Sequence, residues 1–438
     1  MLRIYARVCR LIVSSGLVVA VGSPAVMAQG LGNSPYSALG LGEQYPQGNA
    51  TNIGMGGVGI SNASPFYLNL QNPALLGTRP PYTVFEVGLQ GQVKSLTQRL
   101  NNSNQSQRTV AGNLGYLAIG FPANSRWSMS LSLRPHSYVE YQTQQFAEVP
   151  GTSSVAEYSY SGSGGLNRAA YATGIRVTKN IFLGAEAAYL FGNITTSSDS
   201  RIIVSALGVG TQDSRVTRLN RANYRDIVYK VGAAWRPKLS TNWNLNLGAT
   251  YDPAKQITAS QTEILQQTTL SGIALGNADT LRNNSSGRAT LPQQAHVGIS
   301  LERANRFLVG VDVGFQQWSQ YKGYDGKASG LRDVMTVATG IEYTPKPSST
   351  RYRDLITYRA GFQYNQMPYS VSNQAINDMN VSAGFSLPLG AYFVNHATLS
   401  LVYGQRGVLT GTQLREQYVR IALGFSLTDR WFRKQVVD

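Results

Sequence analysis

The stretch that decides the fold is RFLVGVDVGFQ, residues 306–316. Every second position in it is apolar: Phe307, Val309, Val311, Val313 and Phe315. A period of two is the period of a β-strand, in which successive side chains point to opposite faces. The stretch therefore predicts a strand with one wholly apolar face and an opposite face that carries glycines, Asp312 and Gln316.

The same alternation recurs from residue 82 to the end of the chain, clearly so at residues 127–134 and 419–427. Long strands with one apolar face are typical of outer-membrane barrels, and an even number of strands places both barrel ends on one side. We predict an all-β fold, a transmembrane antiparallel β-barrel of about 14 strands with an N-terminal plug. The candidate strands are residues 82–97, 109–121, 127–146, 155–178, 181–204, 214–236, 243–262, 288–302, 306–318, 332–344, 356–366, 377–387, 396–404 and 415–428.

The connections between these candidate strands alternate in length. Short ones lie at residues 122–126, 178–180, 237–241 and 303–305, and longer polar ones at residues 98–108, 205–212 and 259–287. Short turns at one end and long loops at the other are typical of outer-membrane barrels. A soluble β-sandwich also has alternating strands, but they are typically about five or six residues long. We therefore favour the membrane barrel.

The first 28 residues have the pattern of a secretory signal peptide. Three arginines precede an apolar run at residues 11–21, and the small residues Val26 and Ala28 flank Met27. The run is too short for a comfortable membrane anchor, which is the alternative. We predict removal of residues 1–28 and insertion into the outer membrane of a Gram-negative cell. The single cysteine, Cys9, leaves with this segment, so the mature chain has no disulfide and no thiolate chemistry.

Residues 29–80 separate the signal peptide from the first strand. Their main part, residues 33–80, is NSPYSALGLGEQYPQGNATNIGMGGVGISNASPFYLNLQNPALLGTRP, which has no regular period. A long irregular segment of this kind is a functional loop, a linker or a disordered region, and its many apolar residues argue against disorder. We predict that residues 29–80 form a plug, or hatch, inside a barrel built from residues 81–438.

The chain is basic, with a formal charge of +16 that falls by three when the signal peptide is removed. Its Lys and Arg residues are not clustered and no nucleic-acid-binding motif occurs, so no nucleic-acid partner is predicted. The positive charge instead suits lipopolysaccharide phosphates and other outer-membrane lipid, or the lining of a pore. By parity, the charged or ionisable residues that face the lumen include Glu86, Arg134, Glu186, Lys230, His296, Asp312, Glu342, Arg359 and Arg420.

Isolated charges in a closed lumen are costly, so we expect these residues to pair with one another or with the plug. Direct contact with a ligand is the alternative for any one of them. An enzyme is not indicated, because the three histidines His136, His296 and His396 accompany neither GxSxG nor HExxH. The run GMGGVG at residues 54–59 lacks the Lys-Ser/Thr of a phosphate loop. No cofactor and no metal site is predicted.

Three glycines, Gly162, Gly164 and Gly165, interrupt the candidate strand at residues 155–178. Glycine inside a strand marks a bulge, a bend or a close backbone approach. A kink in a barrel wall that opens a lateral gap is one interpretation. A local bulge that accommodates the plug is the other.

The residues NPALLG at 72–77, preceded by GMGGVGISNASPFYLNLQ at 54–71, resemble the N-terminal region of the FadL/TodX-type outer-membrane transport protein family. The opening NSPYSALGLGEQYPQG, residues 33–48, and the ending LGFSLTDRWFRKQVVD, residues 423–438, are similar to a Gram-negative branch of that superfamily, either PorV-like or related to it. In this resemblance Asn72, Pro73 and Ala74 end the hatch.

The resemblance implies passive uptake of small hydrophobic compounds such as long-chain fatty acids or hydrocarbons, gated by the plug. The ligand would bind between wall and plug beside Phe66, Tyr67 and Leu68 and leave sideways through the wall, for which the glycine break is the candidate. The alternative is a barrel that does not transport but acts as a scaffold or shuttle in a secretion or surface-assembly machine, as PorV-type relatives do. Its partners would then be proteins of that machinery rather than a hydrophobic ligand.

Overall fold

The computed structural model describes residues 30–429 except 101–102, 153, 204–213, 270, 272, 372–373, 391–393 and 410–413. The predicted signal peptide, the expected loop at residues 205–212 and the last nine residues lie outside the described residues. In the part of the chain that is described, no helix combines the length and the apolar character needed to cross a membrane.

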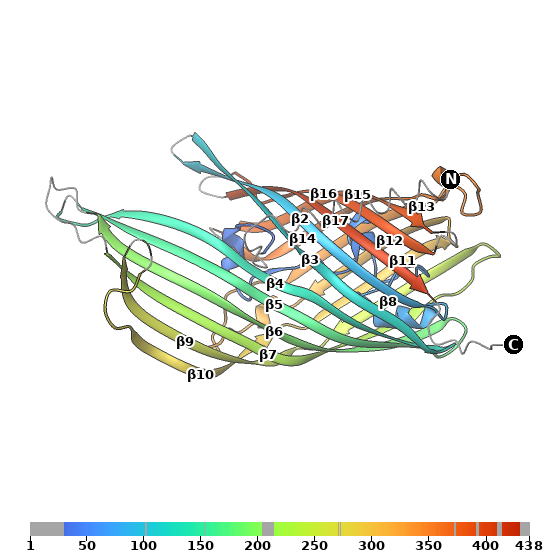
Figure 1. Cartoon of the computed structure of the whole chain (residues 1–438), viewed down its shortest axis with the longest axis horizontal. Coiled ribbons are helices and arrows are strands. Elements are labelled where there is room, and N and C mark those ends of the chain that lie inside the picture. The colour runs from blue at the N-terminus through green and yellow to red at the C-terminus, as the bar shows by residue number, and fades with distance from the viewer. Residues whose placement is uncertain are drawn as a thin grey trace.

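One antiparallel sheet closes on itself to form the wall of a barrel, shown in Figure 1. β8 pairs with β11, whereas β9 pairs with β10. β8 and β9 are thus two halves of one wall strand, interrupted at Pro253, and β10 and β11 are two halves of the next, interrupted at Pro292. A proline cannot donate a ladder hydrogen bond. The described wall therefore has fourteen strands, and the predicted fold class is confirmed.

The wall is formed by the following segments in chain order: β2 (Thr83–Leu100), β3 (Ser103–Asn124), β4 (Trp127–Glu148), β5 (Val155–Arg176), β6 (Ile181–Ile203), β7 (Ser214–Trp235), β8 (Trp243–Asp252), β9 (Lys255–Thr269), β10 (Asp279–Leu291), β11 (Gln294–Arg303), β12 (Phe307–Gln316), β13 (Val334–Tyr343), β14 (Thr357–Val371), β15 (Gln374–Leu389), β16 (Asn395–Arg406) and β17 (Leu414–Asp429). The short helices η3 (Trp318–Gln320) and α3 (Tyr352–Leu355) lie in connections. Closure pairs Asp429 with Thr83, which brings the two ends of the barrel together.

β12 confirms the alternation predicted for residues 306–316. Val311 and Phe315 are about 40 % exposed on the outside, whereas Asp312 is 7 % exposed and points into the lumen. A wall of this kind presents apolar side chains to lipid and keeps its polar groups inside.

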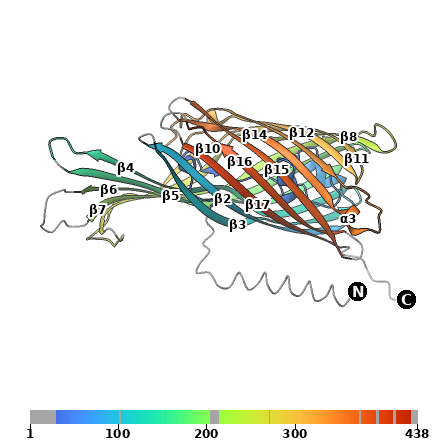
Figure 2. The same ribbon diagram turned by 90° about the horizontal axis from the view of Figure 1, so that it is seen from above.

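Several strands are longer than the sequence pattern indicated, although β12 and β13 are slightly shorter. The predicted long loops at residues 98–108 and 259–287 are wrong, because β2 runs to Leu100, β3 starts at Ser103, β9 runs to Thr269 and β10 starts at Asp279. Beyond the apolar belt both faces of a strand are polar, so the period of two disappears although the backbone ladder continues. Figure 1 shows β4 to β7, β9 and β10 reaching past the ends of the other strands, and Figure 2 shows the β2–β3 hairpin ending apart from them.

Residues 30–80 lie in the lumen, in two parts. The cap segment (residues 30–47) contains η1 (Pro35–Ala38) and β1 (Glu43–Gln44), and the lower plug (residues 48–80) contains α2 (Ala50–Gly54) and η2 (Pro73–Thr78). The side chain of Asn49 caps α2 by accepting from the backbone N–H groups of Thr51 and Asn52. Pro73 starts η2, at a position where a missing N–H costs nothing.

Glycines on the inner wall allow the lower plug to contact the wall backbone to backbone. A Cβ atom added to Gly184 of β6 would lie 2.3 Å from the backbone nitrogen of Ala74, and one added to Gly361 of β14 would lie 2.1 Å from the carbonyl carbon of Met55. Several of these glycines face each other across neighbouring strands, as Gly174 faces Gly184 and Gly340 faces Gly361. The lower plug therefore fits against a belt of the wall that has no side chains.

The close fit along this glycine belt predicts that a single added methyl group destabilises the protein. We expect Gly184→Ala to destabilise the folded protein by about 1–3 kcal/mol, because the methyl group overpacks the contact with η2. Thermal unfolding of the purified barrel in detergent measures the effect. Gly91→Ala is the matched control, since its new methyl group would meet its nearest neighbour at 3.7 Å. Equal melting temperatures for both variants would contradict the tight fit.

Candidate functional site

The Asn72-Pro73-Ala74 element joins the lower plug to the wall. The Asn72 side chain donates from Nδ2 to the carbonyl of Ile60 at 2.9 Å and to that of Ala233 in β7 at 3.2 Å. Its Oδ1 accepts from the backbone N–H of Ala74 at 3.0 Å. One side chain thus fixes the start of η2, a second plug loop and a wall strand, which gives this asparagine a positioning role within the hatch.

Phe66, Tyr67 and Leu68 lie at the end of the lumen nearest the short turns. The guanidinium of Arg359 lies 5.4 Å from the centre of the Tyr67 ring, and the rings of Phe66 and Tyr67 both approach His396. Phe66 and Tyr67 line a cavity of about 40 Å³ together with Glu342 and Arg359, and Leu68 packs in an apolar cluster outside it. This volume is far below the roughly 150 Å³ of a cavity that admits benzene.

Most of the lumen charges named from the sequence are buried and contact a partner. Arg134 and Arg168 both contact Glu186, at 3.2 and 2.5 Å, and Arg134 also donates to the carbonyl of Leu70 in the plug. The other contacts are Glu86 with the N–H of Leu68, Lys230 with Asp252, Asp312 with the N–H groups of Gly59 and Ile60, Arg359 with Glu342, and Arg420 with Gln92.

A larger ion network, which the sequence reasoning missed, holds the cap segment. Arg406 of β16 contacts Glu43 of β1 at 2.7 Å, Asp378 of β15 at 2.8 Å and Glu416 of β17 at 3.4 Å, and all four side chains are at most 6 % exposed. Lys94 of β2 lies 3.7 Å from Glu43 and 3.8 Å from Glu416. The inward parity of Lys94, Glu416 and Arg406 was the signal that could have indicated it.

The electrostatics of Glu43 follow from this environment. Burial raises the pKa of its carboxyl group, but Arg406 and Lys94 lower it by more, so the pKa lies below its ordinary range. Glu43 therefore stays ionised, and the cap segment carries a fixed negative charge that neutralises part of the positive wall.

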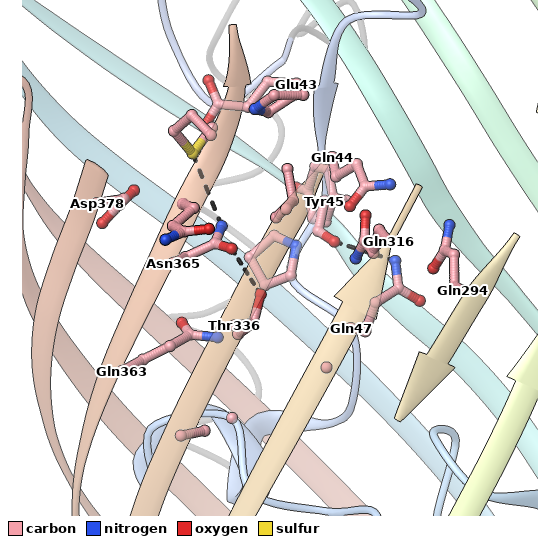
Figure 3. Close-up of a pocket in the computed structure, with 18 of the residues that line it drawn as sticks. Glu43, Gln44, Tyr45, Gln47, Gln294, Gln316, Thr336, Gln363, Asn365 and Asp378 are labelled. Atoms are coloured by element: carbon pink, nitrogen blue, oxygen red, sulfur yellow. Dashed lines mark hydrogen bonds between the residues drawn. The ribbon is translucent and has the colours of Figure 1, made fainter. Parts of the chain in front are cut away.

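A cavity of about 230 Å³ lies between the cap segment, the lower plug and the wall, with lining residues from β4, β5, β7, β8 and β11 to β17. Figure 3 shows that carboxamide groups dominate its labelled lining, from the plug and from several strands. His136 and His296 also line it, whereas His396 lies at the smaller cavity, so the structure does not bring the three histidines together. The labelled lining residues are Glu43, Gln44, Tyr45, Gln47, Gln294, Gln316, Thr336, Gln363, Asn365 and Asp378.

The wall opens between β3 and β4, not beside the glycine break. Gly162, Gly164 and Gly165 stay paired with β4 on one side and with β6 on the other, so the predicted lateral gap is absent there. Gly164 has a φ of 110°, and a Cβ atom on it would meet the carbonyl oxygen of Asn193, so these glycines accommodate a close approach of neighbouring strands.

By contrast, β3 pairs with β4 only from Leu117 to Asn124, against Trp127 to Leu133. From Arg134 onward, the β4 edge on that side meets the cap segment instead. β1 pairs with β4, and Ser34 N donates to the carbonyl of Glu140 at 2.8 Å.

The fold is similar to that of the FadL-like outer-membrane β-barrels. The CymD monoaromatic hydrocarbon channel has a TM-score of 0.57 with this chain at 14% identity, over 88% of this chain and 99% of that one. A Pseudomonas aeruginosa FadL homologue gives 0.56 and 14%, over 89% and 100%. The P. putida toluene transporter TodX also gives 0.56 and 14%, over 89% and 100%.

At these identities the likeness shows the fold alone, which agrees with the FadL/TodX resemblance of the sequence. No curated protein matches the chain. The model of the BamG family matches residues 9–438, so the chain belongs to the BamG family.

The buried network makes a second prediction. Among the described contacts, replacing Arg406 by Met leaves Glu43 and Glu416 with Lys94 as their close cation and removes the ion pair of Asp378. We expect a loss of about 3–5 kcal/mol in stability. Chemical denaturation measured by tryptophan fluorescence tests this. Lys327→Met is the control, because Lys327 and its partner Asp325 are exposed and such pairs contribute about 0–1 kcal/mol. A similar loss in both variants would contradict a network that holds the cap.

Proposed function

We propose that this protein is a non-transporting barrel component of the Bam outer-membrane assembly machinery. The observation that carries the proposal is membership of the BamG family over nearly the whole chain. It corresponds to the scaffold or shuttle alternative of the sequence analysis, with the Bam proteins as partners in place of a hydrophobic ligand.

The lumen supports this proposal. Binding sites for hydrophobic molecules are mainly apolar with a few polar groups. The main cavity here has a mixed lining, in which several carboxamides and charges such as Arg168, Lys230 and Asp252 stand beside apolar side chains. A fatty acid in it would leave many of these groups without hydrogen bonds, and each buried group left in that state costs about 1–3 kcal/mol.

The attachment of the plug supports it as well. Opening a path through the lumen would break the Arg406 network, the Asn72 bridge and the backbone contacts along the glycine belt. A stable plug instead suits a barrel that offers its outer surface and its long strand ends to partners.

Passive uptake of small hydrophobic compounds is the second candidate function. The loss of β3–β4 pairing beyond Leu117 and Leu133 favours it, because the wall strands there are not held together by a hydrogen-bonded ladder. In this alternative the cap segment is the gate, since it occupies the β4 side of the opening.

Purification of the tagged full-length protein from native membranes tests the assembly role. We expect stoichiometric recovery of Bam proteins, because a structural component remains bound in mild detergent. Cells depleted of the protein should accumulate outer-membrane proteins that have not folded, measured by their heat-modifiable migration. Recovery of the barrel alone, together with normal assembly, would overturn the proposal.

A cysteine lock separates the two candidates. Gln44 of β1 and Ser137 of β4 are cross-strand neighbours, and the only natural cysteine lies in the predicted signal peptide. We expect Gln44→Cys/Ser137→Cys, when oxidised, to leave outer-membrane protein assembly unchanged, because the plug is static in that role. Uptake of a labelled fatty acid is the parallel measurement, and each single cysteine variant is a control. Uptake that fails only under oxidation would favour the transporter.

A further inference from the structure

The opening in the wall leaves an unoccupied strand edge on the outer part of β4. β5 pairs with β4 along its whole length, from Trp127 to Glu148. On the other side, the described partners of β4 are β3 up to Leu133 and the cap segment up to Gln142. In the described structure, the stretch from Thr143 to Glu148 therefore has a strand neighbour on one side only.

The cap segment shows that this edge accepts an added chain. Tyr45 N donates to the carbonyl of His136 at 3.0 Å, Ser34 N to the carbonyl of Glu140 at 2.8 Å, and Gln142 N to the side chain of Asn33 at 3.2 Å. Backbone groups of even-numbered residues thus point into the opening. Because antiparallel strands alternate in this respect, those of Gln144 and Phe146 point the same way.

The β4 edge lacks the protection that exposed edges usually carry. Natural edge strands are blunted by lysine, proline or bulges. The stretch QTQQFAE at residues 142–148 has no lysine and no proline, and its register with β5 is unbroken from Ser137 to Glu148.

The opposite edge of the extended sheet, β10, is protected. Its pairing with β9 has two register shifts around Arg282, and Asn284 has a φ of 44°. Tyr324 from the β12–β13 connection covers it further by donating to the carbonyl of Ser285. The same sheet therefore blocks additional pairing at one edge and permits it at the other.

The rim of the opening also presents apolar side chains. Phe146 of β4 is 63 % exposed and Val110 of β3 is 73 % exposed. Main-chain hydrogen bonds to an open edge give affinity for an added strand, and contacts with alternate side chains give selectivity. A strand with apolar residues at every second position, as in the wall of an outer-membrane barrel, matches both features.

We propose that the β4 edge from Gln142 to Glu148 pairs with an edge β-strand of another outer-membrane β-barrel protein, in continuity with the strand that the cap segment already adds to it. The proposal rests on the assembly role, in which proteins of this class are the partners or the substrates. Pairing by the main chain tolerates many strand sequences, as assembly of different barrels requires.

Site-specific photocrosslinking in native membranes tests the proposal. A photoreactive phenylalanine analogue replaces Gln144 on β4 in the full-length protein, and Leu281 on the protected β10 edge is the matched control position. We expect an adduct with another outer-membrane barrel from position 144 and none from position 281. No adduct from position 144, an adduct within the chain, or an adduct with a second copy of this chain would overturn the proposal.

Gln144→Pro adds a backbone test. Proline removes the N–H that points into the opening and leaves the β4–β5 hydrogen bonds in place, whereas Gln144→Thr keeps the N–H. With the photoreactive group at Phe146, we expect the proline variant to lose the adduct and the threonine variant to retain it. Heat-modifiable migration confirms that each variant is folded. If the proline variant does not fold, the crosslinking result from position 144 still tests the proposal.

The result is separable from that of the proposed function. Recovery of Bam proteins without an adduct from position 144 overturns edge pairing and leaves the assembly role intact. If neither Bam proteins nor an adduct from position 144 are recovered, both the assembly role and edge pairing are overturned.

Discussion

Charged side chains that point into a closed lumen need partners there, and in this protein the plug supplies many of them. Arg406 is surrounded by carboxylates from β1, β15 and β17, and one of the three, Glu43, belongs to the cap segment. In the same way Arg134 reaches Leu70, and Asp312 accepts from Gly59 and Ile60. Without the plug these groups would be buried without compensation or would need water. Wall and plug therefore complete each other's charge pairing and hydrogen bonding.

The same constraint explains the distribution of glycine. A barrel of fourteen strands encloses a lumen that side chains alone do not fill, and here backbone fills part of it. Glycines on neighbouring strands remove the side chains where α2, η2 and the loop between them touch the wall. The hydrogen bonds of the plug then reach the inner wall directly, and the space that is left is a cavity lined by both polar and apolar side chains.

Sequence patterns predicted the wall well and the interior less well. The apolar positions of β12 and β17 follow from period two alone, because each strand has lipid on one face. The polar ends of β3, β9 and β10 were missed because water on both faces leaves no alternation to detect. The glycine break in β5 indicated irregular backbone, but Gly164 and Gly165 relieve a close approach inside a continuous sheet. The opening lies next to β4, where Pro135 and a register shift against β5 closely follow Leu133, the last residue paired with β3. A proline inside a strand was the local signal for this departure.

The sequence by itself determined the class of fold, the order of wall and plug, and which charged residues face inward. Alternation is a local property, and each strand carries it independently of the others. Tertiary structure alone decided that Arg406 meets Glu43 across more than 350 positions of chain, that β3 and β4 separate beyond the Leu117–Leu133 pair, and that the cap segment pairs with β4. Pairing between distant segments depends on the closed geometry of the whole barrel, because the register that closes the wall also sets which inward side chains face each other across the lumen.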